Sequence, residues 1–539
     1  MSRNNIPLND REKSKSKISL ICSVAVLIVL CLCFHQADRV LITGPAEKKA
    51  EAQQAEAEAE QEPEVTTANI VAVGDNLFHT SLCESGETES GSWNYDHIYE
   101  HISSYIQDAD LAFINQETVL TDDHDQVSGY SPFATPEEVG DAIVTAGFDV
   151  VSTATNHVDD MGLDMIKSEL DYWSSNHPQV TVIGTNATES DRNTIKTISV
   201  NDITIALLDY TYGTDSGLAT GEDAYVIDTF DKEQVAADIQ KAKEVSDCII
   251  VVAHWGNEGD SKPTEYEKQW ATFLMEQGVD VCIGGHPQTL QPYGTLSDDQ
   301  GNEMLVFYSL GNFVSGQESV SGLLGGMASF TIQKTVDDGQ TSVEITSKSV
   351  EPLVMHYSTQ TDDRAVYMLK DYTEDLAAQH DIHNLSTDEF TLESLYDLYD
   401  EIMSQQIEPS SGTGLLEVTF DSSMNMLDPD GNIVDESYEG TQDTDTSDSG
   451  EDNSDDSSYD DTSSDDGSYD DTSSDDSSYD DTSSDDSSYD DTSSDDSSYD
   501  DTSSDDSSYD DTSSDDSSYD EDSSYDDGSY DDTSSEEEY

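Results

Sequence analysis

Polar side chains that can bind a metal ion follow five short apolar runs of this sequence. Asp75 and Glu117 supply carboxylates. Asn156 supplies an amide oxygen, and His254 and His286 supply imidazole nitrogens. The five segments read Gly74-Asp75-Asn76, Asn115-Gln116-Glu117, Thr155-Asn156-His157, His254-Trp255-Gly256-Asn257-Glu258 and Gly284-Gly285-His286-Pro287. Because an open α/β sheet presents its ligands at the carboxyl ends of its strands, these segments are expected to meet at one edge.

This donor set suits transition-metal chemistry. Carboxylate, amide and imidazole groups together bind one or two divalent ions such as Mn²⁺, Fe²⁺ or Zn²⁺. Such an ion increases the acidity of bound water and polarises a phosphoryl oxygen. Each residue alone has a simpler explanation, because a lone Asp after a strand often caps a helix or forms a turn, and a lone His often has an ordinary structural role. The recurrence at five strand ends is what predicts a metal site.

The segments between these motifs alternate between strand and helix patterns. Apolar runs predict strands at 68–73, 111–114, 148–152, 180–183, 248–253, 279–283, 305–310 and 328–334. Helical spacing predicts helices at 95–106, 136–146, 231–245, 265–277 and 386–405, and one that begins near Leu163. A hairpin is expected in 195–210, with Asn201-Asp202 at its turn. Alternating apolar strands and helices predict a layered α/β fold.

Six motifs follow one another in a defined order. They are Gly74-Asp75, Asn115-x-Glu117, Thr155-Asn156-His157-x-x-Asp160-x-Gly162, His254-Trp255-Gly256-x-Glu258, Gly285-His286-Pro287 and Ser309-Leu310-Gly311-Asn312-Phe313. In this order they resemble the CapA family of bacterial capsule and poly-γ-glutamate synthesis proteins, over about residues 67–357. The specificity lies in the combination, since any one motif alone is weak. That family is related to the calcineurin-like metallophosphoesterases, so the resemblance implies an α/β/β/α sandwich of two sheets flanked by helices.

The resemblance also implies roles for individual residues. The residues that match metal ligands are Asp75, Glu117, Asn156, His254 and His286. His157 matches the histidine that contacts the scissile phosphate, so the catalytic residues would be His157 and Asp75. Asp160 and Glu258 are expected to support the ligands or to bind the metal weakly.

One position departs from the family pattern. The family usually has His-Pro-His where this chain has His286-Pro287-Gln288. A glutamine carbonyl oxygen is a weaker ligand than imidazole, so Gln288 would hold a second metal ion weakly or leave it out. His79 and His124 are the alternative donors that could compensate.

The first residues form a targeting signal. Five basic residues, Arg3, Arg11, Lys13, Lys15 and Lys17, precede an uncharged, mostly apolar run that ends at Phe34. This order predicts a cytoplasmic segment at 1–17, a transmembrane anchor at 18–35 and an extracellular main domain. No good cleavage site follows closely, which favours a single-pass anchor in the cell membrane over a cleaved signal peptide.

The rest of the chain differs sharply in composition. The sequence has 119 acidic and 20 basic residues, and a surface this acidic repels nucleic acid, so no nucleic-acid partner is expected. The composition of residues 36–66 predicts a charged stalk. The main domain is expected at 67–357, and residues 358–440 are expected to form an extension packed on it. Residues 441–539 contain no Lys or Arg and repeat Ser-Ser-Tyr-Asp-Asp-Thr-Ser-Ser-Asp-Asp. This acidic Ser/Asp/Tyr tail should be disordered, and would be a spacer or a polyanionic brush that binds divalent cations or a basic partner.

Three functions compete. The first is a metal-dependent, phosphoesterase-type hydrolase in capsule or poly-γ-glutamate biosynthesis or export; cleavage of an amide bond in the polymer stays open. The second is a non-catalytic factor that uses the same fold to bind an anionic envelope polymer or the capsule synthesis machinery. The third is a surface adhesin or spacer that depends on the acidic tail. Of these, the motifs favour the first.

Overall fold

The computed structural model describes residues 9–38, 48–50, 63–214, 216–217, 221–412, 414–420 and 426–435. The stalk predicted for 36–66 lies mostly outside these residues, and the predicted cytoplasmic segment is described only from Asn9. The acidic tail at 441–539, with its predicted disorder, lies outside them entirely.

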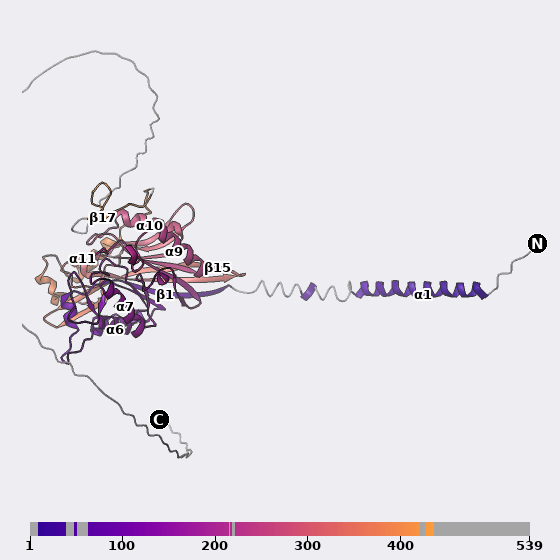
Figure 1. Ribbon diagram of the computed structural model, residues 1–539, viewed down its shortest axis with the longest axis horizontal. Helices are drawn as coiled ribbons and strands as arrows, with labels where there is room; N and C mark the ends of the chain where they lie inside the picture. The colour runs from indigo at the N-terminus through magenta and orange to yellow at the C-terminus, as the bar shows by residue number, and fades with distance from the viewer. Residues whose placement is uncertain are drawn as a thin grey trace, which may run out of the picture. The chain divides into compact units, whose positions relative to one another are not determined.

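A large mixed sheet forms one half of the globular body (Figure 1). Its eight strands include seven in the order β16-β15-β14-β1-β2-β5-β6, and β13 pairs with β1 off this path. The bounds are β1 (Glu64–Asn76), β2 (Leu111–Gln116), β5 (Val150–Ser152), β6 (Thr181–Ile183), β13 (Asn312–Val314), β14 (Leu324–Asp337), β15 (Gln340–Ser358) and β16 (Asp363–Met368). Because β1, β2, β5 and β6 pair in parallel, their carboxyl ends share one edge.

A second sheet has six strands in the order β11-β12-β10-β9-β8-β7. The bounds are β7 (Lys196–Val200), β8 (Ile203–Thr211), β9 (Cys248–His254), β10 (Val281–Gly285), β11 (Tyr293–Ser297) and β12 (Glu303–Phe307). The four central strands are parallel. The short strands β3 (Leu120–Thr121) and β4 (Thr135–Pro136) form one pair, and β17 (Thr419–Phe420) and β18 (Met426–Leu427) another. The second sheet therefore also gathers its carboxyl ends at one edge.

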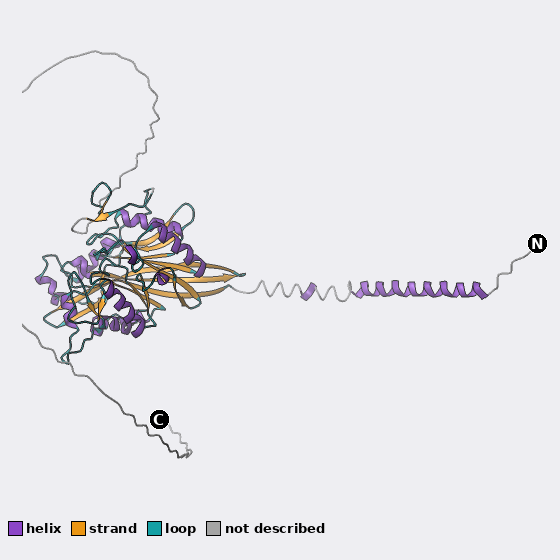
Figure 2. Cartoon of the chain, viewed as in Figure 1, coloured by secondary structure: helices purple, strands orange, loops and turns teal. Residues whose placement is uncertain are grey.

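Helices cover the outer faces of both sheets (Figure 2). Those on the large sheet include α4 (Asp96–Tyr99), α5 (Ser103–Gln107), α6 (Glu138–Ala146) and α7 (Leu163–Asn176). Those on the second sheet are α9 (Lys232–Val245) and α10 (Glu265–Gln277). The remaining helices are α3 (Thr80–Ser85), α8 (Glu189–Arg192), α11 (Val320–Leu323), α12 (Glu374–Gln379), α13 (Leu392–Met403) and the short 3-10 turns Gly221–Asp223 and Asp381–Asn384.

Side chains along each central strand alternate between two cores. In β1, Ile70 and Ala72 face the core between the two sheets, whereas Val71 and Val73 face the helices on the other side. This period of two is what a strand buried on both faces requires. A separate core joins the second sheet to α9 and α10. The layers are therefore helices, sheet, sheet and helices, which confirms the predicted α/β/β/α sandwich.

The N-terminal helix α1 (Asn9–Asp38) differs from the helices of the body in its composition and exposure. Its window Leu20–Ala37 has a mean hydropathy of 2.4, and the side chains there are exposed. By length and composition this helix can cross a membrane, and a signal sequence has the same properties.

Most predicted elements are present, and the main differences concern one helix and two strands of the large sheet. The helix predicted at 95–106 is two short helices, α4 and α5, separated by a turn. The long strand β15 was not predicted, because most side chains in its first half are exposed and polar. The large sheet also continues through β16, which lies beyond residue 357 and pairs with the end of β15.

The cysteines of the body follow the expectation from their surroundings. Their odd number and apolar neighbours predict small buried hydrophobic side chains without disulfides. Cys83, Cys248 and Cys282 are all buried and free, which confirms this.

A close backbone approach near the end of β1 gives a first prediction. A Cβ atom added to Gly74 would lie 1.9 Å from the carbonyl oxygen of Gly311, which directly precedes β13. The backbones of β1 and of the segment before β13 therefore lie very close together. Because backbone atoms cannot move aside cheaply, Gly74→Ala should destabilise the fold by about 1–3 kcal/mol or more. Thermal denaturation measures this. Gly213→Ala is the matched control, since its added Cβ meets nothing within 4 Å. Equal melting temperatures for the two variants would contradict the prediction.

Candidate metal centre

The carboxyl ends of the two sheets meet where the predicted motifs lie. In the large sheet, Asp75 at the end of β1 pairs in register with Asn115 of β2. In the second sheet, His254 at the end of β9 pairs with Gly285 of β10. A Cβ on Gly285 would lie 2.6 Å from Asp75 Oδ1. Gly285 and Asp75 therefore lie close together, so groups from both sheets share one site.

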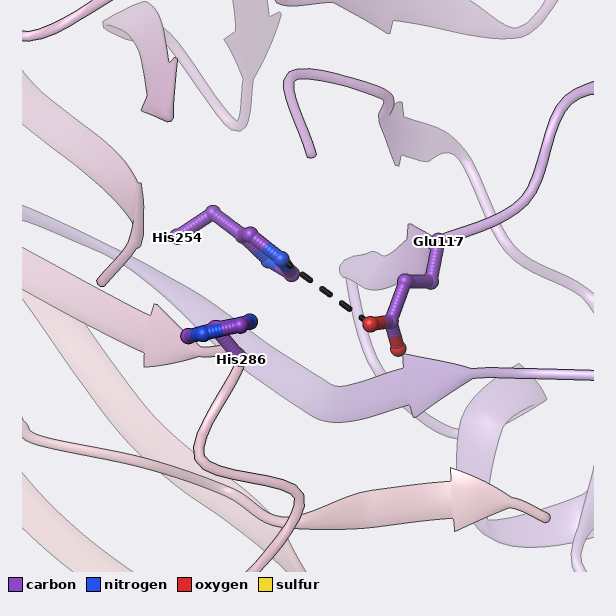
Figure 3. A group of neighbouring side chains, drawn as sticks. All are labelled: Glu117, His254 and His286. Carbon is purple, nitrogen blue, oxygen red and sulfur yellow. Dashed lines mark ion pairs between the residues drawn. The ribbon is translucent and has the colours of Figure 1, made fainter. Parts of the chain in front are cut away.

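Three of the predicted ligands form a compact group. Glu117, His254 and His286 each offer a ligand atom, and these atoms lie within 4.8 Å of one another. Figure 3 shows the two imidazole rings side by side, with the Glu117 carboxylate opposite them. The distance from His254 Nε2 to Glu117 Oε1 is 3.9 Å. All three side chains are buried, so this group has the spacing and the seclusion that a metal ion needs.

The other two predicted ligands adjoin this group. Asp75 Oδ1 accepts a hydrogen bond of 2.7 Å from Asn115 Nδ2, and Oδ2 accepts one of 3.0 Å from the backbone N–H of His286. Asn156 Oδ1 lies 2.8 Å from His254 Nε2. These contacts place the carboxylate of Asp75 and the amide of Asn156 at the edge of the three-residue group.

His157 is held by a carboxylate on its own loop. Its Nδ1 lies 3.1 Å from Asp160 Oδ2, and the same oxygen accepts the backbone N–H of Phe133 at 2.7 Å. The Phe133 ring packs against His157, with centroids 4.8 Å apart. A carboxylate at one ring nitrogen fixes the orientation of an imidazole. Asp160 thus contacts His157, and its expected role in supporting the ligands stays a prediction.

Gln288 and Glu258 also lie at this edge. Gln288 Oε1 accepts a hydrogen bond from Gln317 Nε2, so the oxygen that could bind a metal already has a partner. His286 and Gln288 both adopt positive φ angles, 92° and 56°, which non-glycine residues rarely do. Such backbone conformations persist where surrounding contacts enforce them, and they cluster at functional sites. The charge of Glu258 reaches Asp75, where it helps to raise the pKa of that carboxyl.

Two alternative histidine donors are engaged elsewhere. His79 Nδ1 accepts the backbone N–H of Gly316 at 3.1 Å. His124 lies 3.1 Å from the Glu138 carboxylate and stacks on Trp93. Neither belongs to the three-residue group among the residues that the structure describes.

The protonation of the centre suits a cation. Burial lowers the pKa of His254 well below its usual range and lowers the pKa of His286 to about 3, so both rings are neutral at physiological pH. Neutral imidazole is the form that binds metals. Within the described part of the chain, Nδ1 of each of these two rings is buried without a hydrogen-bond partner. Because buried polar atoms normally have partners, neutral rings beside carboxylates fit a divalent cation.

The buried carboxyl of Asp75 gives a pH-dependent prediction. Burial raises its pKa from 3.8 to about 6, despite the hydrogen bonds from Asn115 and His286. In metal-free protein, the raised pKa means that the protonated Asp75 carboxyl stabilises the folded state. This stabilisation is fully present below pH 3.8 and is lost as pH rises through about 6. We therefore expect Asp75→Asn to raise the melting temperature in chelator at about pH 8, and much less at about pH 4. A difference independent of pH would contradict this.

Two residues at the centre were not singled out from the sequence. Tyr212 packs its ring against His286, with centroids 4.6 Å apart. It directly follows β8, so the rule that site residues follow strands also pointed to it. Gln317 lies in a loop beyond β13 and approaches Gln288 only through tertiary folding, and no local pattern marks it.

Comparison with known proteins places these motifs in one matched span. Residues 69–317 match the family model described as Bacterial capsule synthesis protein PGA_cap, and all six motifs lie inside it. The PGA biosynthesis protein CapA of Bacillus subtilis strain 168 is 27% identical over 224 residues, which are 41% of this chain and 57% of that protein. The Capsule biosynthesis protein CapA of Bacillus anthracis is 30% identical over 239 residues, which are 41% of this chain and 54% of that protein.

The matched region spans just over half the length of these relatives. Among solved structures, one described as a novel phosphatase of Mycoplasma pneumoniae aligns with a TM-score of 0.32 and 14% identity. That alignment covers 54% of this chain and 95% of the other.

Proposed function

We propose that this protein, whose residues 69–317 match the bacterial capsule synthesis protein family, is a membrane-anchored, metal-dependent hydrolase of the phosphoesterase type. It acts in the biosynthesis or export of a capsule or of poly-γ-glutamate. The anchor is the segment 18–35, and the main domain, 67–357, lies outside the cell. The observation that carries the proposal is the buried group of Glu117, His254 and His286 at the joined sheet edges.

The residues that would hold the metal are Glu117, His254 and His286, with Asp75 and Asn156 beside them. One or two divalent ions of Mn, Fe or Zn, when bound, would supply Lewis-acid chemistry toward a phosphoryl oxygen. Asn115 and the His286 backbone hold Asp75 in place through two hydrogen bonds. Burial of the centre strengthens each electrostatic contact there by lowering the local dielectric.

His157 is the residue that this chain offers to the reacting group. Asp160 engages Nδ1, and Nε2 would exchange a hydrogen bond or a proton with the oxygen of the leaving group. Phe133 packs against the ring and limits its rotation. The tautomer would thereby be set before substrate binds.

The test is hydrolysis of p-nitrophenyl phosphate and bis(p-nitrophenyl) phosphate by the purified protein with added Mn²⁺. The wild type should turn over at least one of them, and Asp75→Ala should not. Equal hydrolysis by the two proteins would contradict the proposal, since a contaminating enzyme would then be responsible.

A second function has one supporting observation. The Gln288 oxygen is already bonded to Gln317, which leaves the centre with fewer donors for a second ion. The alternative is a non-catalytic factor that binds an anionic envelope polymer or the capsule synthesis machinery. Binding of poly-γ-glutamate without any shortening of the chains would support it, and absence of binding at every metal concentration would count against it.

A further inference from the structure

A C-terminal segment outside the family match packs against the second sheet and its helices. We call residues 414–420 and 426–435 the strap; it contains β17 and β18. Met426 and Val434 are fully buried in the core on the outer face of that sheet. The backbone N–H of Leu416 donates to Gln269 of α10 at 2.6 Å, and Figure 1 shows β17 beside α10. The strap is therefore an integral layer of the body.

The strap is also fastened to a loop of the metal centre. Asn257, three residues after His254, donates from Nδ2 to the Val434 carbonyl at 2.8 Å. Its Oδ1 accepts the backbone N–H of Met426 at 3.4 Å. Asn257 is 9% exposed, so these hydrogen bonds form largely away from water.

A row of aromatic rings continues from the strap to the metal centre. The Phe420 ring lies 4.9 Å from that of Tyr212, and Tyr212 lies 4.6 Å from His286. The backbone N–H of Tyr212 donates to the His254 carbonyl at 2.9 Å, which fixes Tyr212 beside both histidines. Tyr212 is thus enclosed between a strap residue and a candidate ligand.

This row matters because, within the described residues, the His286 ring is positioned by packing against other rings. Metal-binding histidines usually donate their second ring N–H to a carboxylate or carbonyl, which fixes the ring. Within the described residues, neither ring nitrogen of His286 has such a partner, and Nδ1 is buried without a hydrogen bond. Its ring is positioned by packing, against His254 at 4.8 Å and Tyr212 at 4.6 Å. Edge and face contacts between rings favour particular orientations. Packing against Tyr212 can therefore fix the orientation of the His286 ring, as a hydrogen bond does in other metal-binding histidines.

We propose that Phe420, acting through Tyr212, is a positioning residue for His286. The strap would thereby help to orient a candidate ligand of the metal centre. The inference rests on the proposed function, because it takes His286 to be a ligand. The simpler reading, that Phe420 only covers the outer core, predicts that its loss would change stability and leave His286 unchanged.

The experiment compares full-length proteins in detergent, with histidine labelled by ¹⁵N. The variants are Phe420→Ala, Phe420→Leu, which keeps much of the volume without the ring, and Phe420→Tyr, which keeps the ring. Leu415→Ala is the matched control, because Leu415 packs on the same outer core. His286 is assigned by its loss in His286→Gln, and the buried His356 reports an intact fold. Imidazole NMR signals are recorded without metal, and Co²⁺ affinity is then measured by absorption.

Both ring-removing variants should shift the His286 signals and weaken Co²⁺ binding about tenfold, while His356 stays unchanged. Phe420→Tyr and Leu415→Ala should match the wild type in both readouts. Unshifted His286 signals in Phe420→Ala and Phe420→Leu would overturn the inference, as would an equal shift in Leu415→Ala. If the wild type binds no Co²⁺, the proposed function fails, and the metal-free spectra still decide whether Phe420 positions His286.

Discussion

His254→Ala is expected to lower the affinity for a divalent ion by more than about 100-fold. Loss of a partner behind a ligand costs 10–100-fold, and loss of a ligand itself should cost more. His254 Nε2 lies close to two other predicted ligands, 2.8 Å from Asn156 Oδ1 and 3.9 Å from Glu117 Oε1. Its removal therefore takes a nitrogen donor from the point where the other side chains converge. Competition with a chromophoric chelator measures the dissociation constant.

The control is His124→Ala, which removes an imidazole engaged with Glu138 and Trp93. It should bind metal as the wild type does. If His124→Ala lost the metal and His254→Ala kept it, the ligand assignment would be wrong. Circular dichroism of both variants separates loss of metal from loss of fold.

Asp160→Asn should reduce phosphoester hydrolysis by about 10²–10⁴-fold while metal content is unchanged. The amide has nearly the shape of the carboxylate but can present N–H to His157 Nδ1 and so favour the wrong tautomer; a comparable change in a serine protease triad costs about 10⁴-fold. Asp160 touches His157 at 3.1 Å and is not part of the metal-binding group. The rate should therefore fall without loss of the ion.

A second histidine–aspartate pair provides the control. His177 Nε2 lies 2.6 Å from Asp141 Oδ1, between α6 and the end of α7, where neither residue contacts the predicted ligands. Asp141→Asn should leave hydrolysis unchanged. An equal fall in both variants would mean that the effect comes from general destabilisation.

The layered fold could be predicted because its strands are buried on both faces. Such strands appear in the sequence as short continuous apolar runs, as in Cys248–His254, and the helices between them have clear spacing. The strand β15 escaped prediction because its first half lies exposed and follows neither pattern. The strand β16, beyond residue 357, is placed by its pairing with the distant end of β15 and by packing in the outer core, which no local pattern encodes.

The candidate site could be predicted at the level of residue types and strand ends. Parallel strands force Asp75 and Asn115 to one edge, and His254 and Gly285 to another. What the sequence could not supply is which groups from the two edges converge. The Gln317 contact with Gln288 and the Phe420 contact with Tyr212 join segments far apart in the chain, so no local spacing encodes them.

The divalent metal ion proposed at the joined sheet edges can be measured directly on the purified protein. Elemental analysis of the protein, purified under metal-replete conditions beside an Asp75→Ala/His254→Ala variant, tests it most directly. We expect one or two transition-metal ions per chain in the wild type and none in the variant. A wild-type protein that is folded but carries no metal, or a variant that retains the same amount, would contradict it.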